Sequence, residues 1–176
     1  MALSPTVRRT RSSILLVAAL ILAAASLLLY AYSPDSVEEI DAVVLPERVV
    51  DGDTLWVHSV YGFKAGQSFK VRLADVDTPE RGEPGFFEAK NELNALVSDK
   101  CLLLAVDEPP YDRYGRVVAV VYIPISNDRL LNVNYVLVRK GLARYVDYSG
   151  SFHSENFAPE IAFPAHIQPI LNTYCT

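Results

Sequence analysis

The chain has 176 residues, which leaves room for one domain of ordinary size and a tail but not for two full domains. Three of the 16 basic residues and none of the 21 acidic ones precede residue 33, so the remainder carries a net charge of −8. This balance counts against a broadly basic nucleic-acid-binding protein, although a local patch or a bound cation can still attract a polyanion.

The first recognisable element is an uncharged apolar segment, residues 14–32, which follows Arg8, Arg9 and Arg11. As a helix it would span a bilayer core of about 30 Å. The basic residues should keep 1–13 in the cytoplasm. We therefore expect a single-pass anchor in the cell membrane with the domain outside the cytoplasm. The alternative is a signal peptide cleaved near Ala23-Ala24-Ala25 and a secreted protein.

A short polar linker, residues 33–41, leads into closely spaced strand signals. Runs rich in β-branched and aromatic residues, bounded by turn residues, predict five strands. They are Ala42–Val50, Thr54–Ser59, Ser68–Val76, Cys101–Val106 and Val117–Ile123. The Asp51-Gly52 pair predicts a tight turn between the first two.

Two helices are predicted among these strands. The first begins at Phe86 or Phe87, with Phe87, Leu93, Leu96 and Val97 expected on its buried face. The second runs from an Asn132 cap to Lys140 and is closed by Gly141. The predicted order is three strands, a helix, two strands and a helix. This order indicates an α+β domain, residues 42–148, built on a small closed barrel.

The tail, residues 149–176, is harder to interpret. Prolines at 159, 164 and 169 exclude one continuous helix, and the sequence gives no further structure there. Cys101 and Cys175 are too far apart in sequence to indicate a zinc site. A disulfide between them is allowed outside the cytoplasm, but nothing in the sequence shows that they meet.

Three loops carry polar residues that a barrel does not need in order to fold. They are Asp51-Gly-Asp-Thr54, Leu73-Ala-Asp-Val-Asp-Thr-Pro-Glu-Arg-Gly82 and Asp112-Arg-Tyr-Gly-Arg116. Each has an ordinary explanation when taken singly: an Asp-Gly turn, a helix start before proline, and a polar hairpin.

Together, the three loops fit phosphodiester cleavage. That reaction needs a hard cation on one phosphate oxygen, donors on the others and a base to deliver water. Aspartates and backbone carbonyls suit calcium, and Arg72 and Arg116 could hold a phosphate through paired hydrogen bonds. Strict strand alternation would put Arg72 and Asp77 on opposite faces, so a bulge or a strand end near Val76 is required.

These motifs, in this order and spacing, resemble the staphylococcal nuclease family. The similarity extends through Leu131-Asn-Val-Asn-Tyr-Val-Leu-Val-Arg-Lys-Gly-Leu-Ala143 and so covers about Val43 to Tyr148. The resemblance implies a five-stranded OB-type barrel with two or three helices. It also implies calcium-dependent hydrolysis of DNA and RNA that leaves 3′-phosphates.

The resemblance assigns roles to individual residues. Asp53 and Asp77 match calcium carboxylates, and Thr78 matches a carbonyl ligand to the same ion. Glu80 matches the general base, and Arg72 and Arg116 match the phosphate-binding arginines. Tyr114 matches a tyrosine beside the nucleotide. Asp75 receives no role.

The chain departs from the family pattern in two places near the substrate. The loop from Arg81 to Phe87 is short and lacks phosphate-binding lysines, and Asp147 falls where a stacking tyrosine is expected, which leaves Tyr148 as the candidate platform. We expect a small binding patch around Arg72, Arg113 and Arg116.

The expected partners are single-stranded DNA and RNA, with duplex DNA left open, and the domain is expected to act as a monomer. The alternative functions are a non-catalytic OB-fold domain that binds nucleic acid or protein, and a structural barrel.

Overall fold

The computed structural model describes residues 39–148, 158–162, 164 and 166–175. The expected cytoplasmic N-terminus, the anchor or signal segment and residues 33–38 of the linker lie outside this range. In the part of the chain that is described, no helix is long and apolar enough to cross a membrane.

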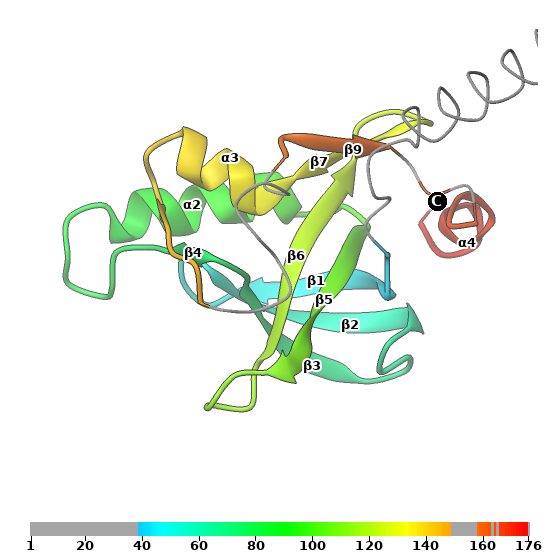
Figure 1. The fold of residues 1–176 in the computed structure, drawn as a ribbon, viewed down its shortest axis with the longest axis horizontal. Helices are drawn as coiled ribbons and strands as arrows, with labels where there is room; N and C mark the ends of the chain where they lie inside the picture. Colours follow the sequence, from blue (N-terminus) through cyan, green and yellow to red (C-terminus); the bar gives the residue numbers. More distant parts are fainter. Residues whose placement is uncertain (1–38, 149–157, 163, 165, 176) are drawn as a thin grey trace, which may run out of the picture. The chain divides into compact units, whose positions relative to one another are not determined.

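Five strands form a closed barrel, as the sequence predicts (Figure 1). They are β1 (Ala42–Val49), β2 (Thr54–Gly62), β3 (Ser68–Leu73), β5 (Leu102–Tyr111) and β6 (Val117–Pro124). Their order is β3-β2-β1-β5-β6, and β3 also pairs with β6 in parallel, which closes the sheet. Alternate residues such as Leu55, Val57 and Val71 are fully buried inside it.

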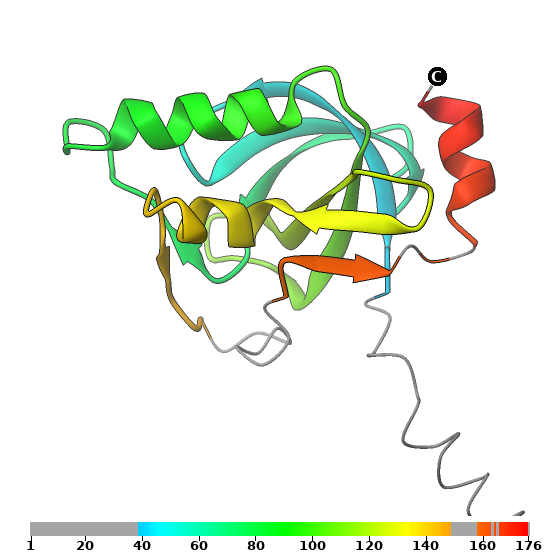
Figure 2. The same ribbon diagram turned by 90° about the horizontal axis from the view of Figure 1, so that it is seen from above.

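Two helices, α2 (Phe86–Val97) and α3 (Val133–Arg139), lie side by side against the barrel (Figures 1 and 2). The prediction that Phe87 faces the core is wrong, because Phe86 is buried while Phe87 is 70% exposed. Phe86 lies seven residues before Leu93, about two helical turns, and so shares its face, whereas Phe87 does not.

The second predicted helix has the expected ends. The side chain of Asn132 accepts a hydrogen bond from the backbone N–H of Tyr135 at 3.0 Å, which caps α3. Gly141 then adopts φ +70°, the left-handed conformation that commonly ends a helix.

The predicted third strand, Ser68–Val76, is in fact two strands. β3 ends at Leu73, the chain turns at Ala74 and Asp75, and β4 (Val76–Asp77) pairs with β8 (Arg144–Tyr145). The fully buried Asn134 of α3 supports this turn, because its Nδ2 donates to the carbonyl of Ala74 at 2.9 Å. Its Oδ1 also accepts from the N–H of Val121 at 3.1 Å.

Part of the C-terminal tail joins the same domain. β7 (Arg129–Asn132) pairs with β6 and with β9 (Glu160–Ala162), and α4 (Gln168–Tyr174) follows. Ile167 and Leu171 belong to a second apolar cluster on the outside of the barrel. α4 itself lies at the end of the barrel away from β4 (Figure 1). Cys175 is disulfide-bonded to Cys101, with their Cα atoms 5.7 Å apart.

Candidate active site

The break between β3 and β4 brings Arg72 and Asp77 together. Asp75, in the break, has φ +54°, which is uncommon for a residue other than glycine and interrupts strand alternation. The Nη2 of Arg72 consequently lies 3.6 Å from Oδ1 of Asp77. The strand end that the sequence requires near Val76 is present.

The turn between β1 and β2 brings Asp53 to the same guanidinium. Its Oδ2 lies 2.7 Å from Nη1 of Arg72 and accepts hydrogen bonds from the N–H and hydroxyl of Thr78, at 3.0 and 2.9 Å. A Cβ on Gly52 would lie 2.7 Å from both the Thr78 hydroxyl and the Cβ of Ala89. The turn therefore needs glycine in order to approach this closely.

Asp53 and Arg72 are largely buried, with side chains 10% and 12% exposed. Burial raises the pKa of Asp53, and the Arg72 charge and the Thr78 hydrogen bonds oppose this effect without cancelling it. The buried Nη1 of Arg72 faces Oδ2 of Asp53 at 2.7 Å, so this ion pair fixes the position of the guanidinium.

Arg116 is linked to this cluster through Thr54. Its Nη1 donates to the Thr54 hydroxyl at 3.1 Å, and that hydroxyl donates to Oδ1 of Asp53 at 3.1 Å. Its Nε donates to Oδ2 of Asp112 at 2.7 Å. Burial opposes ionisation of Asp112, but hydrogen bonds from Arg116 and Tyr114 outweigh it and hold the pKa of Asp112 below its usual value.

The loop before Arg116 presents an aromatic ring to solvent. Tyr114 is 67% exposed, and the guanidinium carbons of Arg113 and Arg116 lie 4.7 and 5.4 Å from its ring centroid. These contacts hold the Tyr114 ring next to Arg116, the arginine of this loop that is predicted to bind phosphate. All three predicted residues of this loop are therefore close together.

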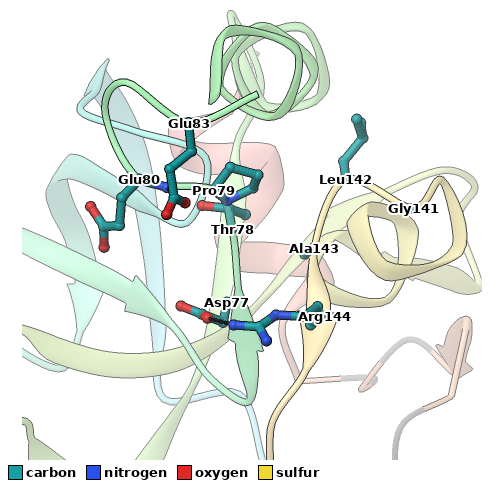
Figure 3. Close-up of a pocket in the computed structure, with 9 residues that line it drawn as sticks. All are labelled: Asp77, Thr78, Pro79, Glu80, Glu83, Gly141, Leu142, Ala143 and Arg144. Carbon is teal, nitrogen blue, oxygen red and sulfur yellow. Dashed lines mark hydrogen bonds and ion pairs between the residues drawn. The ribbon is translucent and has the colours of Figure 1, made fainter. Parts of the chain in front are cut away.

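A pocket of about 450 Å³ opens beside Asp77 (Figure 3). It is lined by Asp77, Thr78, Pro79, Glu80, Glu83, Gly141, Leu142, Ala143 and Arg144. Glu80 is exposed, and its backbone N–H donates to Oε2 of Glu83 at 2.8 Å. The predicted base thus shares a pocket with two of the predicted calcium ligands.

Arg144 is a site residue that the sequence analysis missed. The β4–β8 register sets Arg144 opposite Asp77, and its Nη2 donates to Oδ2 of Asp77 at 2.6 Å (Figure 3). The signal available in the sequence was weak, because Arg144 directly follows the similar segment that ends at Ala143 and carries no motif of its own.

Tyr148 is not among the residues that line the pocket. Its backbone N–H donates to Oδ1 of Asp75 at 3.3 Å, and 56% of the residue is exposed. Its assignment as a stacking platform stays a prediction. Asp75 acquires a structural part, since its carbonyl also accepts from the N–H of Val146 at 2.9 Å and so ties the chain beyond β8 to the turn after β3.

The donor set around Arg72 fits a hard cation. Two carboxylates face one guanidinium, and the peptide that joins Asp77 to Thr78 lies against Asp53. Oδ1 of Asp53 accepts one hydrogen bond, from the Thr54 hydroxyl, and so keeps a second lone pair that can bind a cation. No group of three or more His, Cys, Asp or Glu side chains placed to hold a metal occurs among the described residues. Water and substrate oxygens would complete a calcium shell here.

The chain is similar in sequence to known nucleases. The family described as "Staphylococcal nuclease homologue" matches residues 70–161, which is more than half of the chain. A micrococcal nuclease of Shigella flexneri is 36% identical over 107 residues, or 58% of each chain. A thermonuclease of Staphylococcus intermedius is 36% identical over 106 residues, or 57% of each chain.

A third relative, an uncharacterized endonuclease of Haemophilus influenzae, is 37% identical over 103 residues, which cover 58% of this chain and 52% of the relative. The chain thus spans a little over half the length of these curated relatives. The matched residues contain the end of β3, the turn at Asp75, the pocket and the Asp112–Arg116 loop, whereas Asp53 and Thr54 precede them. The chain therefore belongs to the staphylococcal nuclease homologue family.

Proposed function

We propose that this chain is a calcium-dependent nuclease that hydrolyses phosphodiester bonds of DNA and RNA. The observation that carries the proposal is the convergence of Asp53 and Asp77 on Arg72, beside a pocket that contains Glu80. The nuclease names of the relatives also support it.

Arg72 and Arg116 bind the scissile phosphate in this proposal. Both guanidiniums are held in place, Arg72 by Asp53 and Arg116 by Asp112 and Thr54, so little side-chain freedom is lost on binding. A fixed planar fork donates to two phosphate oxygens at once and is complementary to the charge that develops there during reaction.

Glu80 accepts a proton from the attacking water. Its side chain is exposed and lines the same pocket as Asp77 and Thr78, so it can accept a proton from a water bound in that pocket. As the water oxygen bonds to phosphorus, the bond to the 5′ oxygen breaks and that oxygen takes a proton from solvent, which leaves a 3′-phosphate and a 5′-hydroxyl. A calcium ion held by Asp53, Asp77 and the carbonyl of Thr78 would polarise a phosphate oxygen.

We also propose that the domain acts outside the cytoplasm, anchored in the membrane or secreted, and as a monomer. The Cys101–Cys175 disulfide supports export, since such bonds persist mainly in oxidising compartments. The uncharged segment 14–32 after three arginines supports it as well.

The test of the proposed function is hydrolysis with and without the metal. The full chain, purified in mild detergent, should cut single-stranded DNA and RNA when calcium is present. A chelator should reduce the rate to background, and added calcium should restore it, because two carboxylates without their cation repel the phosphate. The ends of the fragments show which bond is cut. If cleavage leaves 3′-phosphates and 5′-hydroxyls, a ligase should join the fragments only after one enzyme has added phosphate to the 5′ ends and another has removed it from the 3′ ends.

Two results would contradict the proposal. Full activity in chelator would remove the metal from the mechanism. Binding of single-stranded DNA without any hydrolysis in calcium would instead favour a non-catalytic OB-fold domain.

Arg144 offers a test of the metal site that does not depend on activity. Because its guanidinium pairs with Oδ2 of Asp77, Arg144→Gln removes a cation that competes with calcium. Calcium affinity measured by titration calorimetry should increase about two- to fivefold, the equivalent of one exposed ion pair. Arg139→Gln makes the same charge change outside the pocket and is the control. Equal calcium affinities in the two variants would show that Arg144 does not compete.

A further inference from the structure

The outer face of the barrel carries an aromatic ring between two cations. Trp56 of β2 pairs in register with Arg48 of β1 and with Lys70 of β3. The guanidinium carbon of Arg48 and the Nζ of Lys70 each lie 5.5 Å from the Trp56 ring centroid. We call Arg48, Trp56 and Lys70 the tryptophan stripe. Since directly paired residues of antiparallel strands share a face, all three point away from the core.

The tryptophan stripe lies next to the candidate active site. Thr54 and Arg72 are paired with each other, and each lies two residues from the stripe along its own strand, on the same face. Thr54 also accepts a hydrogen bond from Arg116. The stripe and Arg72 therefore lie on a single surface of β2 and β3, and Arg116 reaches this surface from the β5–β6 loop.

The stripe presents two positive charges to solvent. Arg48 and Lys70 are exposed, and neither forms an ion pair with a carboxylate of the described residues. The neighbouring acid, Glu47, accepts a hydrogen bond from Ser68 in the next row of the sheet. In a chain of net charge −5, two exposed cations beside a half-buried indole and an arginine assigned to phosphate binding are complementary to single-stranded nucleic acid, which has both phosphates and bases.

We propose that the tryptophan stripe is a second binding subsite for single-stranded nucleic acid. The exposed side chains of Arg48 and Lys70 move off the Trp56 ring to contact phosphates, and a base stacks on the ring in their place, so that the strand continues from the scissile phosphate across the outer face of the barrel. This inference rests on the proposed nuclease function and extends the binding patch expected around Arg72, Arg113 and Arg116. Longer substrates should accordingly bind more tightly than a dinucleotide.

Trp56 is the single tryptophan of the chain, so its fluorescence reports stacking directly. The full chain carrying Glu80→Gln, which slows cleavage and keeps the calcium ligands, should be titrated in mild detergent and calcium with oligothymidylate of about ten nucleotides, within the usual range for such sites. We expect saturable quenching of Trp56 by the oligonucleotide and little quenching by a thymidine dinucleotide, which fills the active site alone.

Charge variants test the two cations. Arg48→Gln with Lys70→Gln should weaken oligonucleotide binding about tenfold or more and reduce the slope of log affinity against log salt by about 1.4, or two phosphate contacts. The control exchanges one arginine and one lysine outside the stripe, Arg139→Gln with Lys100→Gln, both exposed. Trp56→Leu, measured by anisotropy of a labelled oligonucleotide, should weaken binding at least about fivefold, and Trp56→Phe should retain most of it.

The outcomes separate this inference from the proposed function. Absence of quenching, or equal binding by the stripe variant and the control variant, would overturn the subsite even if calcium-dependent cleavage were observed. Quenching and the salt effect without any cleavage in calcium would support the subsite while the proposed hydrolysis failed.

Discussion

Replacing Glu80 by glutamine should lower kcat for single-stranded DNA by about 10²- to 10⁴-fold, the usual contribution of a positioned general base. Glutamine keeps the size and polarity of the side chain but cannot accept the proton of the attacking water. Glu80 is exposed, so the fold should be unaffected. Steady-state rates at saturating calcium, together with oligonucleotide binding by the same variant, measure the effect.

The pocket provides a matched control in Glu83. Glu83→Gln makes the same chemical change three residues away in the same pocket, and its amide oxygen can still accept the hydrogen bond from the N–H of Glu80. We expect its rate to fall far less than that of Glu80→Gln. If both variants lose activity equally, the negative charge of the pocket matters and not a base at Glu80. If Glu80→Gln is fully active, another group takes the proton.

Much of the barrel could be predicted because its signals are local. Alternating apolar runs and turn residues predict the strands of the barrel, and the cap at Asn132 predicts the start of α3. The extent of β5 could not be predicted in this way. Pro109 and Pro110 suggest a loop, yet β5 continues to Tyr111. The prolines fit within the strand because the pairing of β5 with β6 is interrupted between Val106 and Tyr111, where they lie. A proline without an N–H is tolerated where no ladder hydrogen bond is needed.

In the candidate site, too, the sequence predicts what local residues determine and does not predict what depends on contacts with distant parts of the chain. The sequence predicts that Arg72 and Asp77 belong together and that alternation must be broken between them. It does not predict how, because the turn at Asp75 is held by Asn134 from a helix some 60 residues later in the chain. The Arg144–Asp77 pair likewise depends on the register of two very short strands, which carry almost no periodic signal.

The tail illustrates a third kind of limit. Its prolines correctly exclude one long helix, but the short α4 depends on a surface made by distant strands. Ile167 and Leu171 pack against Val43, Leu103 and other residues that point outward from the barrel. Apolar positions on both faces of β1 and β5 are consistent with a buried outer face. What covers that face could not be read from the residues of these strands.

Loss of the Cys101–Cys175 disulfide should lower the free energy of unfolding substantially. The bond closes a loop of 74 residues, and cross-links of this size stabilise a fold by about 2–4 kcal/mol, with about 4 expected from chain entropy alone. Cys101→Ser with Cys175→Ser should therefore shift the urea midpoint down markedly. The fluorescence of Trp56, in the barrel wall, reports the unfolding transition.

Activity should respond differently, because α4 lies at the end of the barrel away from β4 (Figure 1), the strand whose Asp77 lines the pocket. Below the unfolding transition, the double variant should cleave DNA at nearly the wild-type rate. A reductant should lower the urea midpoint of the wild-type chain to that of the variant and leave the variant unchanged, which separates loss of the bond from any effect of the serines. Equal midpoints for the oxidised wild type and the variant would mean that the cross-link contributes nothing to stability. A large loss of activity at low temperature would mean that α4 supports the site through the second apolar cluster, in which Ala74 lies next to the turn at Asp75.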